Sequence, residues 1–143
     1  MATIRQLLAS KGYEVWSTGP EDTVYDALKL MAEKNIGALL VLDSGKIVGI
    51  VSERDYARKV ILKGKASAKT PVSEIMTSDL VTVEPQMSVK KALSLMTDRH
   101  IRHLPVLEEG QLAGIVSIGD LVKTIIAEQE LFISQLESYI AGM

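Results

Sequence analysis

Cysteine is absent from this sequence and aromatic residues are scarce: the 143 residues include one tryptophan, one phenylalanine and four tyrosines. Without cysteine the chain has no disulfide, no thiolate metal ligand and no cysteine nucleophile, which suits a reducing compartment. The two histidines, His100 and His103, are too few to build a zinc site without cysteine. We therefore expect no metal.

Long apolar runs are also missing. No stretch approaches the 18 consecutive apolar residues of a membrane-spanning helix, and residues 1–12 lack the apolar core of a signal peptide. The net charge of −2 gives no overall attraction to nucleic acid or to an anionic membrane. With 47% apolar and 24% charged residues, the chain has the composition of a folded domain. We expect a cytoplasmic protein without membrane association.

What the sequence does contain is an internal repeat. Residues 20–61 and 85–126 align without a gap and are identical at 17 of 42 positions. The clearest shared phrase is Gly-Ile-Val-Ser-x-x-Asp, which starts at Gly49 and again at Gly114, 65 residues later. Because a repeat of this density implies that both copies form the same supersecondary unit, it decides how the rest of the chain is interpreted.

Each copy shows the same order of local signals. A short extended segment ends at a proline, and a polar cap, Thr23 or Ser88, precedes apolar residues at helical spacing. Two β-rich runs joined by a glycine-containing turn follow, and then a second helix that starts at Ser52 or Ser117. The pattern predicts an α/β (α+β) fold: a β-α-β-β-α unit, twice, with the two halves packed in pseudo-twofold fashion.

The same signals predict the domain boundaries. We expect repeat 1 at residues 4–63, a polar linker at 64–71 and repeat 2 at 72–127. Residues 4–8 and 72–76 are similar amphipathic lead-ins to the two repeats. The tail at 128–143 continues an apolar stripe that begins at Leu121, which predicts a C-terminal helix that packs either on its own core or on a second subunit.

The Ser-x-x-Asp phrase at the start of each second helix has two interpretations. As a capping box, its serine hydroxyl and aspartate carboxylate accept hydrogen bonds from free N–H groups of the first helical turn. As a ligand site, the helix N-terminus attracts phosphate while the carboxylate accepts hydrogen bonds from both hydroxyls of a ribose. The repeat favours the second interpretation for Asp55 and Asp120, with Ser52 and Ser117 serving both purposes.

These features together resemble a pair of CBS domains, also called a Bateman module. The resemblance covers residues 4–127, is strongest to stand-alone CBS-pair proteins of bacteria and plants (the CBSX type included), and is carried by residues 52–56, 58–59, 63–64, 71–77, 102–106 and 116–120. It implies a regulatory module that binds an adenosine ligand between its repeats. AMP is the first candidate, with ADP, ATP, NAD and S-adenosylmethionine as alternatives.

The resemblance also implies which residues line two clefts, because in this family each cleft combines the Ser-x-x-Asp of one repeat with the opening strand and pre-strand residues of the other. Cleft A would use Ser52 and Asp55 with Val81, Thr82, Pro85, Arg102, His103 and Pro105. Cleft B would use Ser117 and Asp120 with Trp16, Ser17, Thr18, Ile36, Gly37 and Ala38.

Cationic side chains would make the two clefts chemically different. Arg102 can fork onto phosphate oxygens and His103 can donate a hydrogen bond when protonated, whereas the first copy has Gly37 and Ala38 at these positions. The alternative for both is a solvated helix end with cations near the C-terminal dipole. Arg54 could contact phosphate in either cleft.

Two further positions bear on cleft B. Trp16 could stack on a purine or fill the core, and the residues leave both alternatives open. Leu40 stands where the family usually has a proline, whereas Pro105 retains it in the second copy.

Other function classes find less support in the residues. We expect no catalytic residues, because the chain offers no cysteine, no nucleophile elbow, no suitable histidine–carboxylate pair and no metal set. Residues 54–69 hold six cations and one acid, the basis for an alternative nucleic-acid-binding module, but no aromatic stacking platform accompanies them. We therefore predict an adenine-nucleotide sensor that acts in trans on an unidentified partner protein and forms a homodimer.

Overall fold

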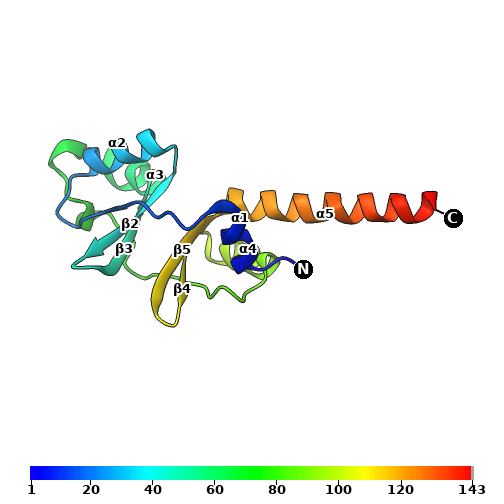
Figure 1. The fold of residues 1–143 in the computed structure, drawn as a ribbon. Helices are drawn as coiled ribbons and strands as arrows, with labels where there is room; N and C mark the ends of the chain where they lie inside the picture. Colours follow the sequence, from blue (N-terminus) through cyan, green and yellow to red (C-terminus); the bar gives the residue numbers. More distant parts are fainter. Residues whose placement is uncertain (143) are drawn as a thin grey trace. The chain divides into compact units, whose positions relative to one another are not determined.

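The computed structural model describes residues 1–142 and divides the chain into two compact units (Figure 1). Residues 15–80 form the first-repeat unit. Of the described residues, 1–14 and 81–142 together form the second-repeat unit. The boundaries of the two units therefore differ from those of the sequence repeat, because the first lead-in, residues 4–8, belongs to the second-repeat unit.

The first-repeat unit is a three-stranded sheet with helices. Its elements are β1 (Ser17–Thr18), α2 (Val24–Lys34), β2 (Ala38–Asp43), β3 (Lys46–Ser52), α3 (Glu53–Tyr56), the π-helical segment η1 (Ala57–Ile61) and the 3₁₀ turns η2 (Ser67–Lys69) and η3 (Val72–Glu74). In the sheet, β1 runs parallel to β2 and β2 runs antiparallel to β3. The predicted β-α-β-β-α order is confirmed.

The second-repeat unit repeats this order with a shorter first strand. Its elements are α1 (Ile4–Lys11), α4 (Val89–Arg99), β4 (His103–Glu108), β5 (Gln111–Ser117) and α5 (Ile118–Ala141). The expected opening strand is one parallel bridge, in which Val83 N donates to Pro105 O at 3.1 Å and Leu107 N donates to Val83 O at 2.9 Å. The predicted C-terminal helix is present as α5.

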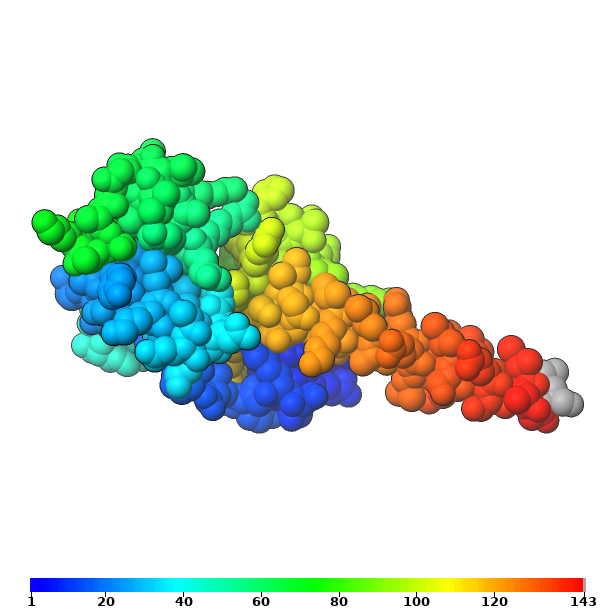
Figure 2. Space-filling view, turned by 90° about the horizontal axis from the view of Figure 1, so that it is seen from above, coloured from blue at the N-terminus to red at the C-terminus, as the bar shows by residue number. Residues whose placement is uncertain are grey.

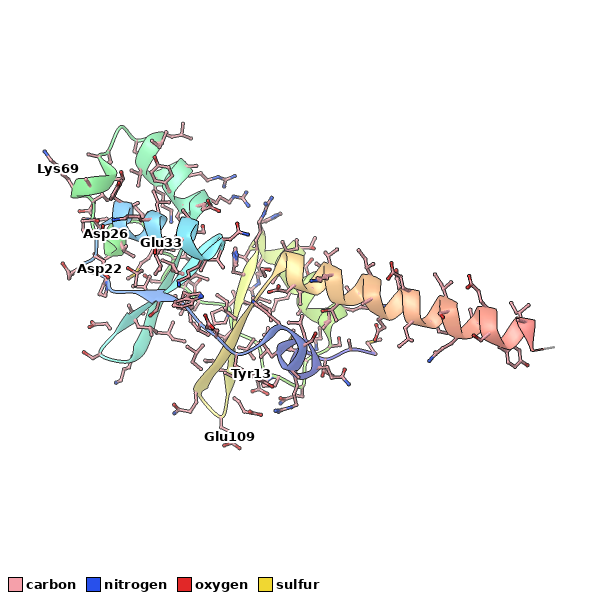
Figure 3. The ribbon with its side chains drawn as sticks, turned by 45° about the horizontal axis from the view of Figure 1, so that its top comes forward. Tyr13, Asp22, Asp26, Glu33, Lys69 and Glu109 are labelled. Atoms are coloured by element: carbon pink, nitrogen blue, oxygen red, sulfur yellow. The ribbon has the colours of Figure 1, made fainter. Side chains whose placement is uncertain are left out.

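The backbone conformation repeats with the same period as the sequence. Within residues 1–142, the non-glycine residues with positive φ form two pairs 65 residues apart. Asn35 and His100 lie at the ends of α2 and α4, and Ser44 and Glu109 lie in the hairpin turns. Figure 3 shows Glu109 at the tip of the β4–β5 hairpin. Ser44 and Glu109 are each followed by a glycine that also has positive φ, as two-residue hairpin turns require. The glycine-containing turns predicted from the sequence are therefore confirmed.

Each unit has its own apolar core, and the lead-ins are exchanged between the cores. Ile4, Leu7 and Leu8 of α1 are buried in the core of the second-repeat unit. Val72 and Ile75, from the other lead-in, are buried in the core of the first-repeat unit. Each lead-in thus packs on the repeat that it does not precede in the sequence.

The exchange explains why the repeated phrase begins with glycine. A Cβ at Gly114 would lie 2.9 Å from Leu8 Cδ2, and a Cβ at Gly49 would lie 2.7 Å from Met76 Sδ. Leu8 and Met76 occupy equivalent positions in the two lead-ins. Glycine leaves room for each lead-in side chain to approach its strand this closely, because a Cβ at either position would lie nearer than real Cβ contacts do.

Helix α5 begins in the core of its unit and then leaves it. Leu121 is fully buried, whereas every described residue after Glu128 is exposed. Figures 1 and 2 show the distal part of α5 standing clear of α1 and α4, the helices of its own unit. Over residues 1–142, no helix is long and apolar enough to cross a membrane.

Candidate functional site

Both Ser-x-x-Asp phrases form capping boxes. Ser52 N donates to Asp55 Oδ2 at 3.0 Å and Asp55 N donates to Ser52 Oγ at 3.1 Å. In the second copy Ser117 N donates to Asp120 Oδ2 at 2.8 Å and Asp120 N donates to Ser117 Oγ at 3.1 Å. The capping interpretation is confirmed, and it leaves room for a ligand because an ionised carboxylate offers about four acceptor sites.

A lysine neutralises the carboxylate in the first-repeat unit. Lys59 Nζ lies 3.1 Å from Asp55 Oδ1 and also donates to Ile75 O at 2.9 Å. Lys59 follows Asp55 by four residues, a spacing that brings side chains together on one helical face. This ion pair could therefore have been inferred from the sequence.

The second-repeat unit obtains its lysine from another part of the chain. The position equivalent to Lys59 is Thr124, which carries no charge. Instead Lys11, the last residue of α1, places its Nζ 2.7 Å from Asp120 Oδ2 and 2.8 Å from Ile115 O. Both carboxylates thus have a lysine that also binds a main-chain carbonyl, although the two lysines come from unrelated positions. Sequence reasoning missed Lys11 because no local signal connects residues 109 apart.

Lys11 also affects the pKa of its partner, Asp120. Burial alone would raise the pKa of the Asp120 carboxyl, but the Lys11 ammonium and the hydrogen bonds from Ser117 outweigh it and hold this pKa below its ordinary value. Asp120 is therefore ionised at neutral pH. It can accept hydrogen bonds from a ligand but cannot donate one.

The expected phosphate-binding residues lie beside Asp120 in the second-repeat unit. His103 is the first residue of β4 and pairs with Ser117, and the carbonyl of the exposed Arg102 accepts a hydrogen bond from Ile118 N at 2.8 Å. Burial lowers the pKa of His103, and the cations Lys11 and Arg102 lower it further against the opposite effect of Asp120. His103 is therefore neutral at pH 7 in the ligand-free protein.

The other expected phosphate contact, Arg54, lies in the first-repeat unit, where it is exposed on α3. Each predicted cleft draws on both units. The contacts of Arg54, Arg102 and His103 across the clefts therefore stay predictions.

The cleft B residues of the first-repeat unit are already engaged with that unit. Trp16 packs against its core, and Lys34 Nζ lies 4.1 Å from the centroid of the Trp16 ring, a cation–π contact. Thr18 Oγ1 donates to Asp22 Oδ2 at 3.0 Å, and Gly37 O accepts from Glu53 N at 3.0 Å. The core-filling interpretation of Trp16 is thus supported by its packing. The remaining members are Ser17 in β1, the half-buried Ile36, and Ala38 at the start of β2.

The cleft A residues of the second-repeat unit include two buried prolines. Pro85 O accepts from Arg5 N at 2.9 Å, so Pro85 helps to hold α1 in place, and Pro105 lies within β4. Val81 is half-buried. Thr82 is exposed and lines an open depression of about 660 Å³ in this unit, together with side chains of both charge signs.

The basic segment is partly neutralised within its own unit. Lys59 pairs with Asp55, and Lys65 Nζ lies 3.7 Å from Glu74 Oε2. Lys69, labelled in Figure 3, lies in η2. These ion pairs reduce the positive potential that a nucleic acid would meet, and nothing in the described residues favours the nucleic-acid alternative.

A β-α-β-β-α unit that occurs twice, with a Ser-x-x-Asp cap on each second helix, defines the class of tandem modules to which this protein belongs. The CBS-domain family model matches residues 9–62 and 72–127, and the chain belongs to that family. CBS domains are generally regulatory and often bind adenine nucleotides. Within residues 1–142, no group of three or more histidine, cysteine, aspartate or glutamate side chains is placed to hold a metal ion.

Similar proteins come from plants and bacteria. The mitochondrial CBS domain-containing protein CBSX3 of Arabidopsis thaliana is 43% identical over 98% of this chain and 72% of its own length. A CBS-domain protein of Burkholderia ambifaria has 52% identity and a TM-score of 0.87, covering 90% of this chain and 96% of that one. A hexameric CBS-CP12 protein from bloom-forming cyanobacteria has 31% identity and a TM-score of 0.76, covering 85% and 70% respectively.

Proposed function

We propose that this chain is a sensor that binds an adenine nucleotide and regulates a partner protein in trans. AMP is the first candidate, and ADP, ATP, NAD and S-adenosylmethionine are the alternatives. The ligand would occupy clefts A and B, each formed by the Ser-x-x-Asp of one repeat with the opening strand and pre-strand residues of the other. It would act by shifting the population between two arrangements of the repeats, to the extent that its affinities for them differ.

The observation that carries this proposal is the pair of half-buried carboxylates, Asp55 and Asp120, at two helix N-termini. Asp55 and Asp120 are each held by a serine cap, so their remaining acceptor sites have a defined direction. Two adjacent ribose hydroxyls can donate to such a carboxylate, and a nearby helix N-terminus favours the phosphate. Lys59 and Lys11 support this role because each offsets the negative charge that an approaching phosphate would meet.

Cleft A is proposed as the tighter phosphate site. The exposed guanidinium of Arg102 is available for a bidentate contact, and a phosphate beside the neutral His103 would favour its protonation. Cleft B has Gly37 and Ala38 at the same positions, which offer only backbone groups.

Self-association and compartment complete the proposal. We propose a homodimer, because α5 exposes large apolar side chains, and the hexameric CBS-CP12 relative shows that proteins with this module can form oligomers. The proposed compartment is the cytoplasm, a reducing compartment that suits a sequence without cysteine. The relative CBSX3, by contrast, is named as mitochondrial.

Thermal unfolding with a panel of ligands tests the proposal. AMP, ADP, ATP, NAD and S-adenosylmethionine are added singly, with GMP as the control for adenine specificity. A ligand present at 100 times its dissociation constant stabilises the folded state by about 2.7 kcal/mol, which gives a clear shift of the melting temperature. The Asp55→Ala/Asp120→Ala double variant should lose the shift. If no adenosine ligand stabilises the wild-type protein, the sensor proposal is wrong.

A further inference from the structure

A line of exposed side chains, apolar at five of its six positions, runs along α5. The α5 seam consists of Val122, Ile126, Gln129, Ile133, Leu136 and Ile140. The spacing alternates between four and three residues, which is the heptad spacing of helices that pack along their length. The apolar members are 40–66% exposed, from Val122 at 40% to Ile140 at 66%.

The helix's own unit does not cover the seam. It packs instead against another side of α5, which carries the buried Leu121 and the half-buried Thr124 and Glu128. Glu128 also pairs with the amino group of Met1 at 3.7 Å. Figure 3 shows the side chains of the distal part of α5 extending from the ribbon with no other element of the unit beside them. The seam is thus open from Val122 to Ile140.

The charges of α5 argue against a lipid surface as the occupant. Lys123 is its one cation, against four acids: Asp120, Glu128, Glu130 and Glu137. Interfacial helices are rich in cations on their polar face, because these attract anionic headgroups. An anionic membrane would instead repel α5.

A second copy of the same helix matches the seam when it runs antiparallel. In that alignment Ile126 faces Leu136 of the second copy, and the remaining seam positions face each other as Val122 with Ile140 and Gln129 with Ile133. Beside the seam, Lys123 faces Glu137, and twofold symmetry makes this pair occur twice. Phe132, which is 61% exposed, meets its own copy at the centre.

A parallel alignment would leave the charges of Lys123 and Glu137 without a partner of opposite sign. Lys123 and Glu137 would then face apolar side chains of the second copy, since the positions across from them are Ile118 and Phe132. It would also place two folded units side by side at one end of the pair, whereas the antiparallel alignment separates them. Charge complementarity and the smaller steric crowding between the folded units therefore both favour the antiparallel pair.

We propose that the α5 seam is the interface with a second copy of this chain, and that the two α5 helices pack antiparallel with Lys123 opposite Glu137. This inference rests on the self-association proposed above and is independent of nucleotide binding. It assigns the interface to a segment outside both CBS matches for most of its length, because the second match ends at residue 127.

Sedimentation velocity of the full chain at tens of micromolar tests the seam. The Ile133→Glu/Leu136→Glu variant should be monomeric, because it places charges in the apolar interface. The control Ser134→Glu/Ser138→Glu adds the same charge on another side of the helix and should stay dimeric. Circular dichroism and the nucleotide panel show whether the seam variant is folded. A seam variant that is folded and still dimeric would refute the interface and leave the dimer itself standing, whereas a monomeric wild type would refute both.

Charge exchange tests the direction. Lys123→Glu and Glu137→Lys should each weaken the dimer by about tenfold, because each replaces two attractive pairs with two repulsive ones. Combining both substitutions should restore the wild-type dissociation constant. If the dissociation constant of the double variant instead rises by the product of the two single-variant factors, the antiparallel pairing is wrong.

Discussion

Lys11 Nζ lies 2.7 Å from Asp120 Oδ2, which joins the end of α1 to the start of α5 across 109 residues of sequence. The first-repeat unit obtains the same arrangement locally, from Lys59 and Asp55 within one helical stretch. In both repeats a lysine thus forms an ion pair with the aspartate of the Ser-x-x-Asp phrase, but the two lysines come from unrelated positions in the chain. This difference is the basis of the first prediction.

Lys11→Met should destabilise the protein in a pH-dependent way. The folded-state pKa of Asp120 lies below its ordinary value of 3.8, so its ion pair stabilises the fold above that pH and is lost as the pH falls through the folded-state pKa. At pH 7 we expect a loss of about 1 kcal/mol in the free energy of unfolding, since both side chains are partly exposed. Urea titrations at pH 7 and pH 3 measure it, with Lys90→Met, an exposed lysine of α4, as the control. An effect of equal size at both pH values would contradict the ion-pair account.

Asp55→Ala and Asp120→Ala should affect different binding events. Asp55→Ala should weaken the tighter nucleotide-binding event about ten- to a hundredfold, which corresponds to one charge-assisted hydrogen bond of about 1.5–3 kcal/mol. Asp120→Ala should change a weaker event or none. Calorimetric titration separates the two, and the Asp→Asn variants serve as controls that keep an acceptor for the cap. Loss of the tight event in Asp120→Ala alone would mean that the two clefts are assigned the wrong way round.

Arg102→Ala should reduce the affinity for AMP much more than that for adenosine. Only AMP carries the phosphate with which the guanidinium would form a bidentate contact. The expected loss is about ten- to a hundredfold for AMP and less than about twofold for adenosine. Binding of both ligands to Arg102→Ala, with Arg99→Ala as the matched control, gives the ratio. Equal losses for the two ligands would show that Arg102 does not contact the phosphate.

Gly114→Ala should destabilise the second-repeat unit by about 1–3 kcal/mol, because the added Cβ would meet the side chain of Leu8 at 2.9 Å. Leu8→Ala should cost about 2–5 kcal/mol, but it also creates the space that the added Cβ needs. The double variant should therefore lose less than the sum of the two. At Gly49 the same cycle with Met76→Ala should recover less, since a Cβ there also lies 3.0 Å from the main-chain oxygen of Thr77. Chemical denaturation of both cycles gives the coupling energies, and additivity at Gly114 would contradict the close contact.

The sequence by itself determined the features that depend on local pattern and period. The 65-residue repeat, the order β-α-β-β-α, the caps at Ser52 and Ser117 and the hairpin turns all follow from the spacing of apolar, polar and glycine residues. The resemblance to the CBS family rested on the same spacing. The ion pair of Lys59 with Asp55 belongs to this group, because residues four apart share a helical face.

Only the tertiary structure decided which distant segments meet. The two lead-ins are similar in sequence, and burial in either core would remove the apolar face of each from water. No local pattern therefore predicts that each lead-in packs on the repeat that it does not precede. The contacts of Lys11 with Asp120 and of Leu8 with Gly114 follow from that exchange, so no period or motif could have shown them. Position 124 shows the reason most simply: the repeat has threonine where Lys59 would be expected, and the missing charge is supplied from the far end of the chain.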